Sequence, residues 1–177
     1  MEARIVNEVR MENEHFFNRW APRYDRPLVQ YWMKKFQVPV IQEIDFSTKP
    51  SILDISCGTG ELLKFIVHAG KGKFYGVDLA EKMLEKARTK LPAKVNLQKA
   101  DVHALPFKEN TFDYTITTEA FHHYYNQRQA LREMRRVTKK GGKVIVVDIN
   151  FFLRPIHFLF QKLEPGSVKI NSKKEMG

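Results

Sequence analysis

The chain has 177 residues, a formal net charge of +10 and a hydrophobic content of 43%, enough apolar material for the core of one domain. The single cysteine, Cys57, excludes a disulfide framework and a cysteine-rich metal site, and we expect no metal. The amino terminus is charged throughout, unlike a signal peptide, and no apolar run approaches the roughly 18 residues that span a bilayer. We therefore expect a cytoplasmic protein without a transmembrane segment.

The lysines and arginines are scattered through the chain and are mostly interleaved with acids. Such a pattern is typical of a solvated surface, whereas RNA-binding surfaces combine basic with aromatic side chains. The sequence gives no strong nucleic-acid signal, and an RNA partner stays an alternative that rests on net charge alone.

Two helices are predicted in residues 1–45. Residues 12–24 have amphipathic spacing with aromatic side chains on one side and a stop at Pro22. A second helix is predicted over residues 27–44, kinked or divided at Pro39. We interpret residues 1–45 as a helical lid or cap, although plain packing of the aromatics on the core explains the pattern equally well.

The stretch SILDISCGTGEL, residues 51–62, predicts a buried strand, a loop of small residues and the start of a helix. This arrangement brings the main chain close to nucleotide-like ligands. Gly58 and Gly60 have no Cβ, so a ligand can lie against the backbone there.

The nature of that ligand is indicated by the residues around the loop. Leu63 stands where a dinucleotide-binding fingerprint requires its third glycine. The carboxylates of Asp54 and Glu61 flank the loop and would repel a pyrophosphate, whereas they would attract a cationic group. The loop therefore favours a cationic, nucleoside-like ligand.

Two further predicted strands end in acids. The strand over residues 74–78 ends in Asp78, which is twenty positions after Gly58 and is suited to accept hydrogen bonds from ribose hydroxyls. The strand over residues 95–101 ends in Asp101, which is suited to an exocyclic adenine amine. Three strands with an acid at or near the carboxyl end are a more specific signal than any one alone.

With these features, residues 16–150 resemble the class I S-adenosylmethionine-dependent methyltransferases, in particular the small-molecule group of ubiquinone/menaquinone biosynthesis. The resemblance rests on LDISCGTG (53–60), GVDLAEKML (76–84), KADVHALPF (99–107), FDYTITTEAFHHYYN (112–126) and LREMRRVTKKGGKVIVVD (131–148). It implies an α/β Rossmann-like fold with parallel strands in the order 3-2-1-4-5, flanked by helices, and a cofactor-binding core over residues 46–150. The family commonly has a glycine at the position of Ser56.

The resemblance also implies S-adenosylmethionine as cofactor and S-adenosylhomocysteine as product. Asp78 would hold the ribose and Asp101 the adenine amine, while Asp54 would orient the loop or the amino group. The other residues expected at the cofactor are Arg19, Tyr24, Ser56, Cys57, Gly58, Gly60, Leu79, Met83, Val102 and Thr118.

The predicted fourth strand, residues 112–118, should present its carboxyl end to the transferred methyl group. His122 and His123 follow it and form the plausible acid–base pair of the chain, because either could take a proton from a phenol, amine or thiol. A role in holding a loop is an open alternative, since methyl transfer can proceed by in-line positioning without a base. Thr117-Thr118-Glu119 replaces the Asn/Asp-Pro-Pro-aromatic motif of many nucleic-acid amino methyltransferases.

The remaining sequence predicts a helix over residues 127–139 that stops at Gly141-Gly142, and a fifth strand over residues 143–149. Residues 151–177 are interpreted as an incomplete carboxyl-terminal segment, so strands 6 and 7 of the fold are expected to be missing. The apolar tract 151–160 favours a hydrophobic acceptor, a dimer surface or a membrane surface. A homodimer would cover the open edge of the fifth strand.

The sequence thus predicts a methyltransferase that moves a methyl group in line to a small, aromatic or lipophilic acceptor. A truncated, catalytically impaired module that binds the cofactor or a partner is the alternative, and an RNA methyltransferase ranks below both.

Overall fold

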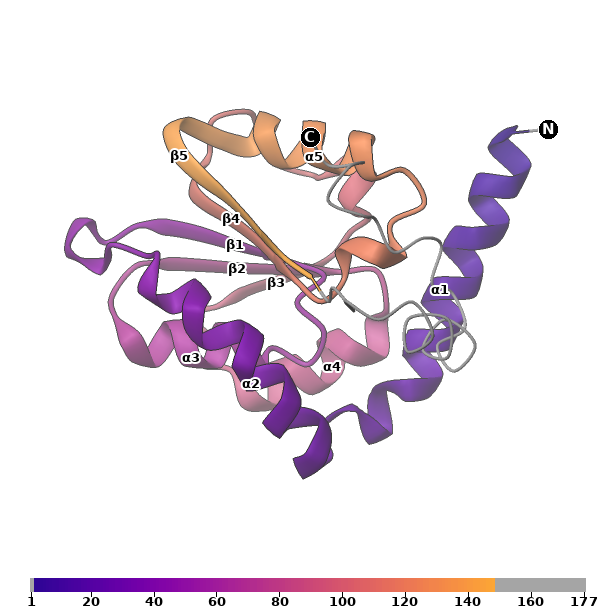
Figure 1. Ribbon diagram of the computed structural model, residues 1–177, viewed down its shortest axis with the longest axis horizontal. Helices are drawn as coiled ribbons and strands as arrows, with labels where there is room; N and C mark the ends of the chain where they lie inside the picture. The colour runs from indigo at the N-terminus through magenta and orange to yellow at the C-terminus, as the bar shows by residue number, and fades with distance from the viewer. Residues whose placement is uncertain (1, 149–177) are drawn as a thin grey trace, which may run out of the picture.

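The computed structural model describes residues 2–148, which form a five-stranded sheet with helices on both faces (Figure 1). The strands are β1 (Ser51–Ile55), β2 (Lys73–Asp78), β3 (Asn96–Lys99), β4 (Phe112–Thr118) and β5 (Thr138–Val147). The helices are α1 (Glu2–Tyr24), α2 (Pro27–Gln42), α3 (Glu61–Ala69), α4 (Glu81–Lys90) and α5 (Gln127–Val137). Short 3-10 turns occur at η1 (Phe46–Thr48), η2 (Val102–Ala104) and η3 (Phe121–His123). The predicted apolar tract and the carboxyl-terminal segment lie outside the described residues.

All strand pairs are parallel, and the strand order β3-β2-β1-β4-β5 confirms the predicted fold. The chain winds outward from β1 to β3 and then returns to place β4 on the other side of β1. This reversal makes the carboxyl ends of β1 and β4 the topological switch point, where open α/β sheets bind their ligands.

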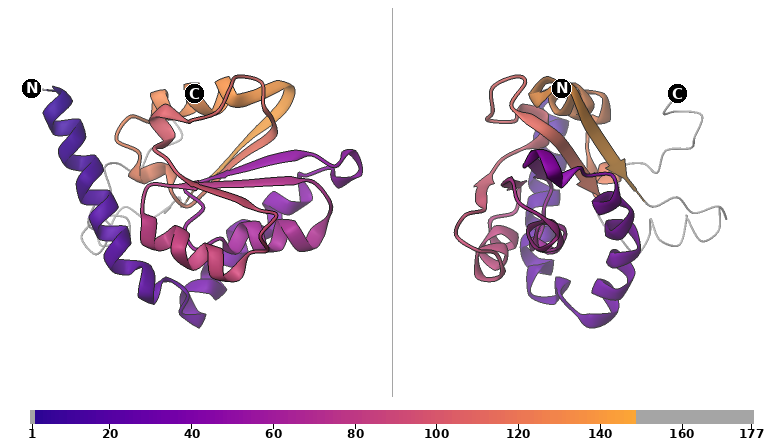
Figure 2. Two further views of the ribbon diagram at one scale, coloured as in Figure 1. Left: turned by 180° about the vertical axis from the view of Figure 1, so that it is seen from behind. Right: turned by 90° about the vertical axis from the view of Figure 1, so that its left-hand side faces the viewer.

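Two hydrophobic layers hold the sheet between its helices. On one face, Ile52 and Phe74 pack with residues of α2, α3 and α4; on the other, Leu53 and Ile55 pack with residues of α5. Figure 2 shows these helices on opposite faces of the sheet. Successive β1 side chains enter opposite layers, as a strand with period two requires, and this explains the unbroken apolar run of its sequence.

The first helix stands across the carboxyl ends of the strands and meets α2 in a corner (Figures 1 and 2). Its inner side packs on α4, where Ala21, Ala80 and Met83 form a small buried cluster with Phe17 and Tyr24. Among the helices described, none is both long enough and apolar enough to cross a membrane.

Two predicted boundaries are wrong, at the first helix and at Gly141-Gly142. The first helix begins ten residues before the predicted start, at Glu2, and it includes Pro22 in its last turn. Of the two predicted effects of Pro39, a kink or a division, the division is wrong, because α2 runs through Pro39. The pair Gly141-Gly142 does not stop a helix; it lies inside β5, where the pairing with β4 changes register and Gly141 has a φ of 81°. The two glycines lie at an irregularity of the strand, where the extra residues of β5 leave the regular pairing. From the local sequence alone, glycines at such a site look the same as glycines at a helix end.

Candidate functional site

A pocket, here called the α1 pocket, opens between α1 and the carboxyl ends of β1, β2 and β4, with η2 and η3 in its wall. The predicted site residues that line it are Tyr24, Ser56, Gly58, Asp78, Leu79, Met83, Asp101, Val102, Thr118 and His123. A smaller side pocket lies against the same loop and is lined by Asp54 and Cys57 together with Tyr24, Ser56 and Thr118. Gly60, Arg19 and His122 line neither pocket.

Asp78 is the best-organised acid of the α1 pocket. Its Oδ2 accepts a hydrogen bond from the Gly58 amide at 2.8 Å, and its Oδ1 accepts one from the Ala80 amide at 2.8 Å. Burial raises the pKa of Asp78 to about 6, although the backbone hydrogen bonds oppose this rise. The carboxylate therefore joins the loop after β1 to the end of β2 and still borders the pocket.

The turn after β1 uses left-handed backbone conformations at Ser56 and Gly58, with φ values of 58° and 52°. Ser56 stands where the family commonly has glycine, and its side chain makes a contact that glycine lacks, because Ser56 Oγ lies 3.0 Å from the Tyr124 hydroxyl. Thr117 Oγ1 lies 2.8 Å from the same hydroxyl. Tyr124 thus joins the β1 loop to the end of β4.

Gly60 serves a different purpose from Gly58. A Cβ on Gly58 would face the Tyr24 ring at 3.7 Å, in the wall of the α1 pocket. A Cβ on Gly60 would come within 2.7 Å of Leu91 Cδ1 and 3.2 Å of Ala87 Cβ. The space beside Gly60 is therefore occupied by α4 and the residue after it, not by a ligand pocket.

Asp101 forms a compact cluster with two aromatic neighbours. Its Oδ1 accepts from the His103 amide at 2.9 Å and lies 2.6 Å from His103 Nδ1, while its Oδ2 accepts from the Tyr125 hydroxyl at 3.1 Å. Burial alone would raise its pKa, but these hydrogen bonds outweigh burial and the pKa of Asp101 lies below its ordinary value. The His103 and Tyr125 rings stack with centroids 3.6 Å apart.

Asp54 and Cys57 are deeply buried beside the side pocket, at 2% and 8% exposure. Burial, and next the charge of Asp78, raises the pKa of Asp54 well above its ordinary value. Burial and then Asp54 also raise the pKa of the Cys57 thiol. The thiol is therefore held in its protonated form and is unsuited to act as a nucleophile.

The two histidines that follow β4 face different surroundings. His123 borders the α1 pocket and meets the Phe17 ring edge-on, with centroids 5.0 Å apart. His122 turns toward the end of β5, where its Nδ1 lies 2.7 Å from Asp148 Oδ1 and its amide donates to Asp148 Oδ2 at 2.8 Å. The pocket thus receives one imidazole of the predicted pair.

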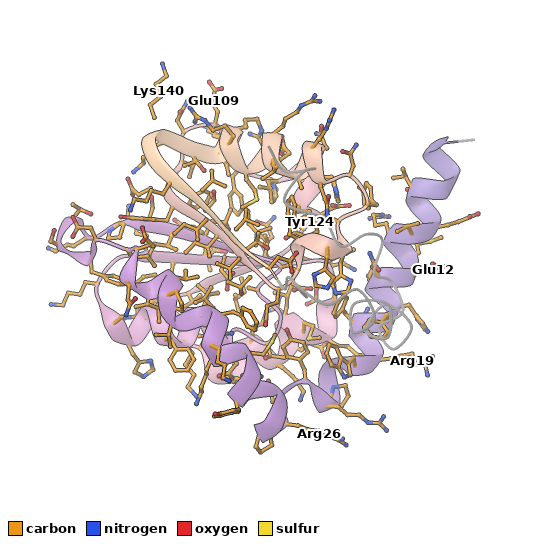
Figure 3. All side chains as sticks on the ribbon, in the orientation of Figure 1. Glu12, Arg19, Arg26, Glu109, Tyr124 and Lys140 are labelled. Atoms are coloured by element: carbon orange, nitrogen blue, oxygen red, sulfur yellow. The ribbon has the colours of Figure 1, made fainter. Side chains whose placement is uncertain are left out.

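The first helix contributes residues that the sequence did not single out. Arg10, Asn13, Glu14 and Phe17 line the α1 pocket from α1, whereas Arg19 is exposed and points away from it (Figure 3). The helical period alone could have grouped residues 10, 13, 14, 17, 21 and 24 on one face, had the helix been predicted at its full length. Tyr124, which Figure 3 shows between the sheet and α1, was missed for lack of any local signal.

No three acidic, histidine or cysteine side chains gather into a possible metal site within residues 2–148. The polar side chains that border the α1 pocket carry carboxylates, hydroxyls, two imidazoles, the Asn13 carboxamide and the Arg10 guanidinium. Such a set suits an organic ligand with hydroxyl and amine donors.

Known proteins match this chain over most of its length. Residues 53–146 match a family model described as a methyltransferase domain. The chain is 30% identical over 152 residues to a demethylmenaquinone methyltransferase of Shouchella clausii, covering 80% of this chain and 65% of the relative. It is 26% identical over 167 residues to a ubiquinone/menaquinone biosynthesis C-methyltransferase of Geotalea uraniireducens, covering 86% and 71%. It spans about two thirds of the length of these curated relatives.

Among solved structures, a chain of the complex between the Haloferax volcanii Trm112 methyltransferase activator and a methyltransferase matches with a TM-score of 0.80. It is 20% identical and the match covers 90% of this chain and 72% of that one, which supports the fold.

The family match extends over more than half of the chain and includes the β1 loop, Asp78, Asp101 and the end of β4. The resemblance to the ubiquinone/menaquinone group of S-adenosylmethionine-dependent methyltransferases is confirmed by the curated relatives. The chain therefore belongs to the methyltransferase-domain family.

Proposed function

We propose that the chain binds S-adenosylmethionine in the α1 pocket and transfers its methyl group to a small acceptor of the quinone class. The observation that carries this proposal is the placement of Asp78 and Asp101 at the ends of neighbouring strands, around one pocket floored by the Gly58 turn. An adenosine needs such a set: an acceptor pair for the ribose hydroxyls and a second acceptor for the adenine amine.

Both polar and apolar residues of the α1 pocket support the binding of the adenosine part of the cofactor there. Asp78 would accept from the ribose hydroxyls while its other lone pairs keep the Gly58 and Ala80 amides. Leu79 and Val102 border the same space and would cover the adenine faces. Asp101, held ionised by His103 and Tyr125, would accept from the adenine amine.

The acids around the β1 loop support the binding of the cationic methionine part of the cofactor there. The loop lies between the acids Asp54 and Asp78 and offers the Gly58 backbone beneath the Tyr24 ring. Like charges would repel a phosphate there, whereas a sulfonium and an ammonium are attracted. This is the difference that separates the site from a dinucleotide pocket.

The acceptor would approach from the end of β4. When bound, S-adenosylmethionine supplies an electrophilic methyl group on a positively charged sulfur. The Phe17 and His123 rings, which meet edge-on, border the pocket there, and Thr118 offers a hydroxyl that can orient an acceptor oxygen. The acceptor would react in its reduced, hydroquinone form, because the oxidised quinone is not a nucleophile. As its new bond to the methyl carbon forms, the bond from that carbon to sulfur would break and S-adenosylhomocysteine would leave, and His123 would take the proton that the acceptor loses. The quinone class is supported by the printed names of the curated relatives.

We also propose that residues 1–45 act as a lid. The α1 helix closes the pocket through Asn13, whose Nδ2 donates to the His123 carbonyl at 3.0 Å, and through Phe17 on the His123 ring. Both contacts join the lid to the expected methyl-transfer end, so ligand entry requires them to open.

The first test is calorimetric titration with S-adenosylhomocysteine. Wild type should bind, and Asp78→Asn should bind about 100-fold more weakly, because it removes a charged acceptor of two hydroxyl groups. Asp45→Asn is the matched control, since Asp45 is exposed, caps η1 and lines neither pocket. Equal affinities of wild type and Asp78→Asn would refute the ribose assignment.

Transfer itself is tested by following labelled methyl groups into a reduced demethylmenaquinone analogue. Label in the quinone product supports the proposed acceptor class. If the chain binds the cofactor but transfers no label to quinone, phenol or amine acceptors, the proposed transfer is refuted and the chain acts as a cofactor-binding module.

A further inference from the structure

The side pocket contains two buried acceptor oxygens that lack hydrogen-bond partners within the described part of the chain. They are Asp54 Oδ2, from the next-to-last residue of β1, and Gln37 Oε1, from α2. Both side chains line the side pocket, and their residues are only 2% and 4% exposed. A buried acceptor without a donor is costly, so two in one pocket indicate a missing donor group.

The missing donor must satisfy both an amide oxygen and a carboxylate. Glu61 also lines the side pocket, and it is already paired with Lys90, whose Nζ lies 2.7 Å from Glu61 Oε1 and 2.6 Å from Asp25 Oδ1. Glu61 therefore supplies no donor to the two free oxygens, since an ionised carboxylate only accepts. An ammonium group matches this environment, because it is positively charged and carries several hydrogen-bond donors.

The side pocket lies beside the α1 pocket, and the two share part of their walls. Tyr24, Ser56 and Thr118 line both. An adenosine bound against Asp78 would place its 5′ substituent beside Ser56 and Gly58, so a chain of a few atoms from that position reaches the side pocket.

We propose that Gln37, together with Asp54, binds the α-ammonium group of the cofactor's methionine part. This assignment rests on the proposed function and deepens it, because it makes α2 a part of the binding site and not only a cover of the sheet. Gln37 is then the residue by which the site recognises the amino-acid tail, whereas Asp78 and Asp101 recognise the nucleoside.

The test compares two ligands on matched variants by calorimetry. S-adenosylhomocysteine carries the amino-acid tail, and 5′-methylthioadenosine has the same adenosine and sulfur without it. Gln37→Leu removes the acceptor at similar volume and should weaken S-adenosylhomocysteine about tenfold, leaving 5′-methylthioadenosine within about twofold. Gln42→Leu, the same change at an exposed position of α2, should alter neither affinity.

A second variant and a third ligand separate the remaining explanations. Gln37→Glu keeps an acceptor oxygen and should retain the affinity for S-adenosylhomocysteine. This variant tests the proposal even if Gln37→Leu fails to fold. The amine S-adenosyl-3-thiopropylamine lacks the carboxylate and should show the same loss in Gln37→Leu. If this ligand were unaffected, Gln37 would contact the carboxylate and the assignment would be overturned.

The outcomes also distinguish this inference from the proposed function. Wild type that binds neither S-adenosylhomocysteine nor 5′-methylthioadenosine refutes the cofactor pocket itself. Wild type that binds both, with no selective effect of Gln37→Leu, leaves the cofactor pocket in place and refutes the ammonium site, since the side pocket would then hold water only.

Discussion

At the scale of single residues, the two glycines of the β1 loop show how one motif serves two purposes. Gly58 borders the α1 pocket beneath Tyr24, and its amide donates to Asp78. Gly60 starts α3 with a φ of 80° and packs against Leu91. The first glycine is thus part of the proposed binding surface, whereas the second allows α4 to approach the loop.

This difference predicts unequal stabilities for two alanine variants. Gly60→Ala and Gly141→Ala both place a side chain at a φ near 80°, which costs about 1–2 kcal/mol. A Cβ at Gly141 meets nothing within 4 Å, whereas one at Gly60 displaces Leu91. Gly60→Ala should therefore lose about 1 kcal/mol more in urea unfolding. Equal losses would show that the packing at Leu91 adjusts freely.

At the scale of elements, α1 is held at the open end of the sheet by polar contacts at intervals along its length. Asn13 donates to the His123 carbonyl, and the Lys82 amide donates to Asn18 Oδ1 at 3.0 Å. After its last turn, Asp25 accepts from Thr59 Oγ1 at 2.7 Å and pairs with Lys90 at 2.6 Å. The hydrogen bond from Thr59 to Asp25 joins the lid to the binding loop itself, because Thr59 lies between Gly58 and Gly60.

Asp25→Ala should therefore loosen the lid more than it unfolds the core. We expect faster dissociation of bound S-adenosylhomocysteine in stopped-flow experiments, together with faster proteolysis within α1, because the charge-assisted hydrogen bonds at the corner are lost. Glu12→Ala is the matched control, since Glu12 is an exposed carboxylate on the outer side of the same helix (Figure 3). An unchanged dissociation rate in Asp25→Ala would contradict the lid's connection to the loop.

The elements also show what could be predicted from the sequence. The family resemblance predicts the strand order, and the structure confirms it. The pocket position of Asp78 and Asp101 is predicted from two strands that each lead to an acid, which is a local signal. Gln37 and Tyr124 could not be predicted, because their importance comes from neighbours far away in the chain. Gln37 and Asp54 line the same side pocket, and Tyr124 contacts Ser56. Neither contact produces a periodic or compositional pattern in the sequence.

At the scale of the whole molecule, five aspartates have pKa values that are shifted from the ordinary value in one of two opposite directions. Hydrogen bonds and ion pairs outweigh burial and lower the pKa values of Asp25, Asp101 and Asp113. Burial raises those of Asp54 and Asp78, the latter to about 6. The acids with lowered pKa stabilise the fold above their ordinary pKa and lose this effect as the pH falls below it. The acids with raised pKa oppose folding once they ionise.

Stability should therefore reach its maximum in mildly acidic solution and not at neutral pH. Asp78 binds a proton in the folded chain up to about pH 6 but in the unfolded chain only up to about its ordinary value of 3.8. The free energy of unfolding should thus fall by about 1 kcal/mol between pH 5 and pH 7.5 from this residue alone. Urea unfolding of wild type and Asp78→Asn across this range isolates the effect, because the histidines are common to both chains. Affinity for S-adenosylhomocysteine should change in the opposite direction and weaken below about pH 6, since ribose hydroxyls require the ionised carboxylate. Parallel pH profiles of stability in the two chains would show that Asp78 is already ionised in the folded protein at pH 5, and burial would then not govern its titration.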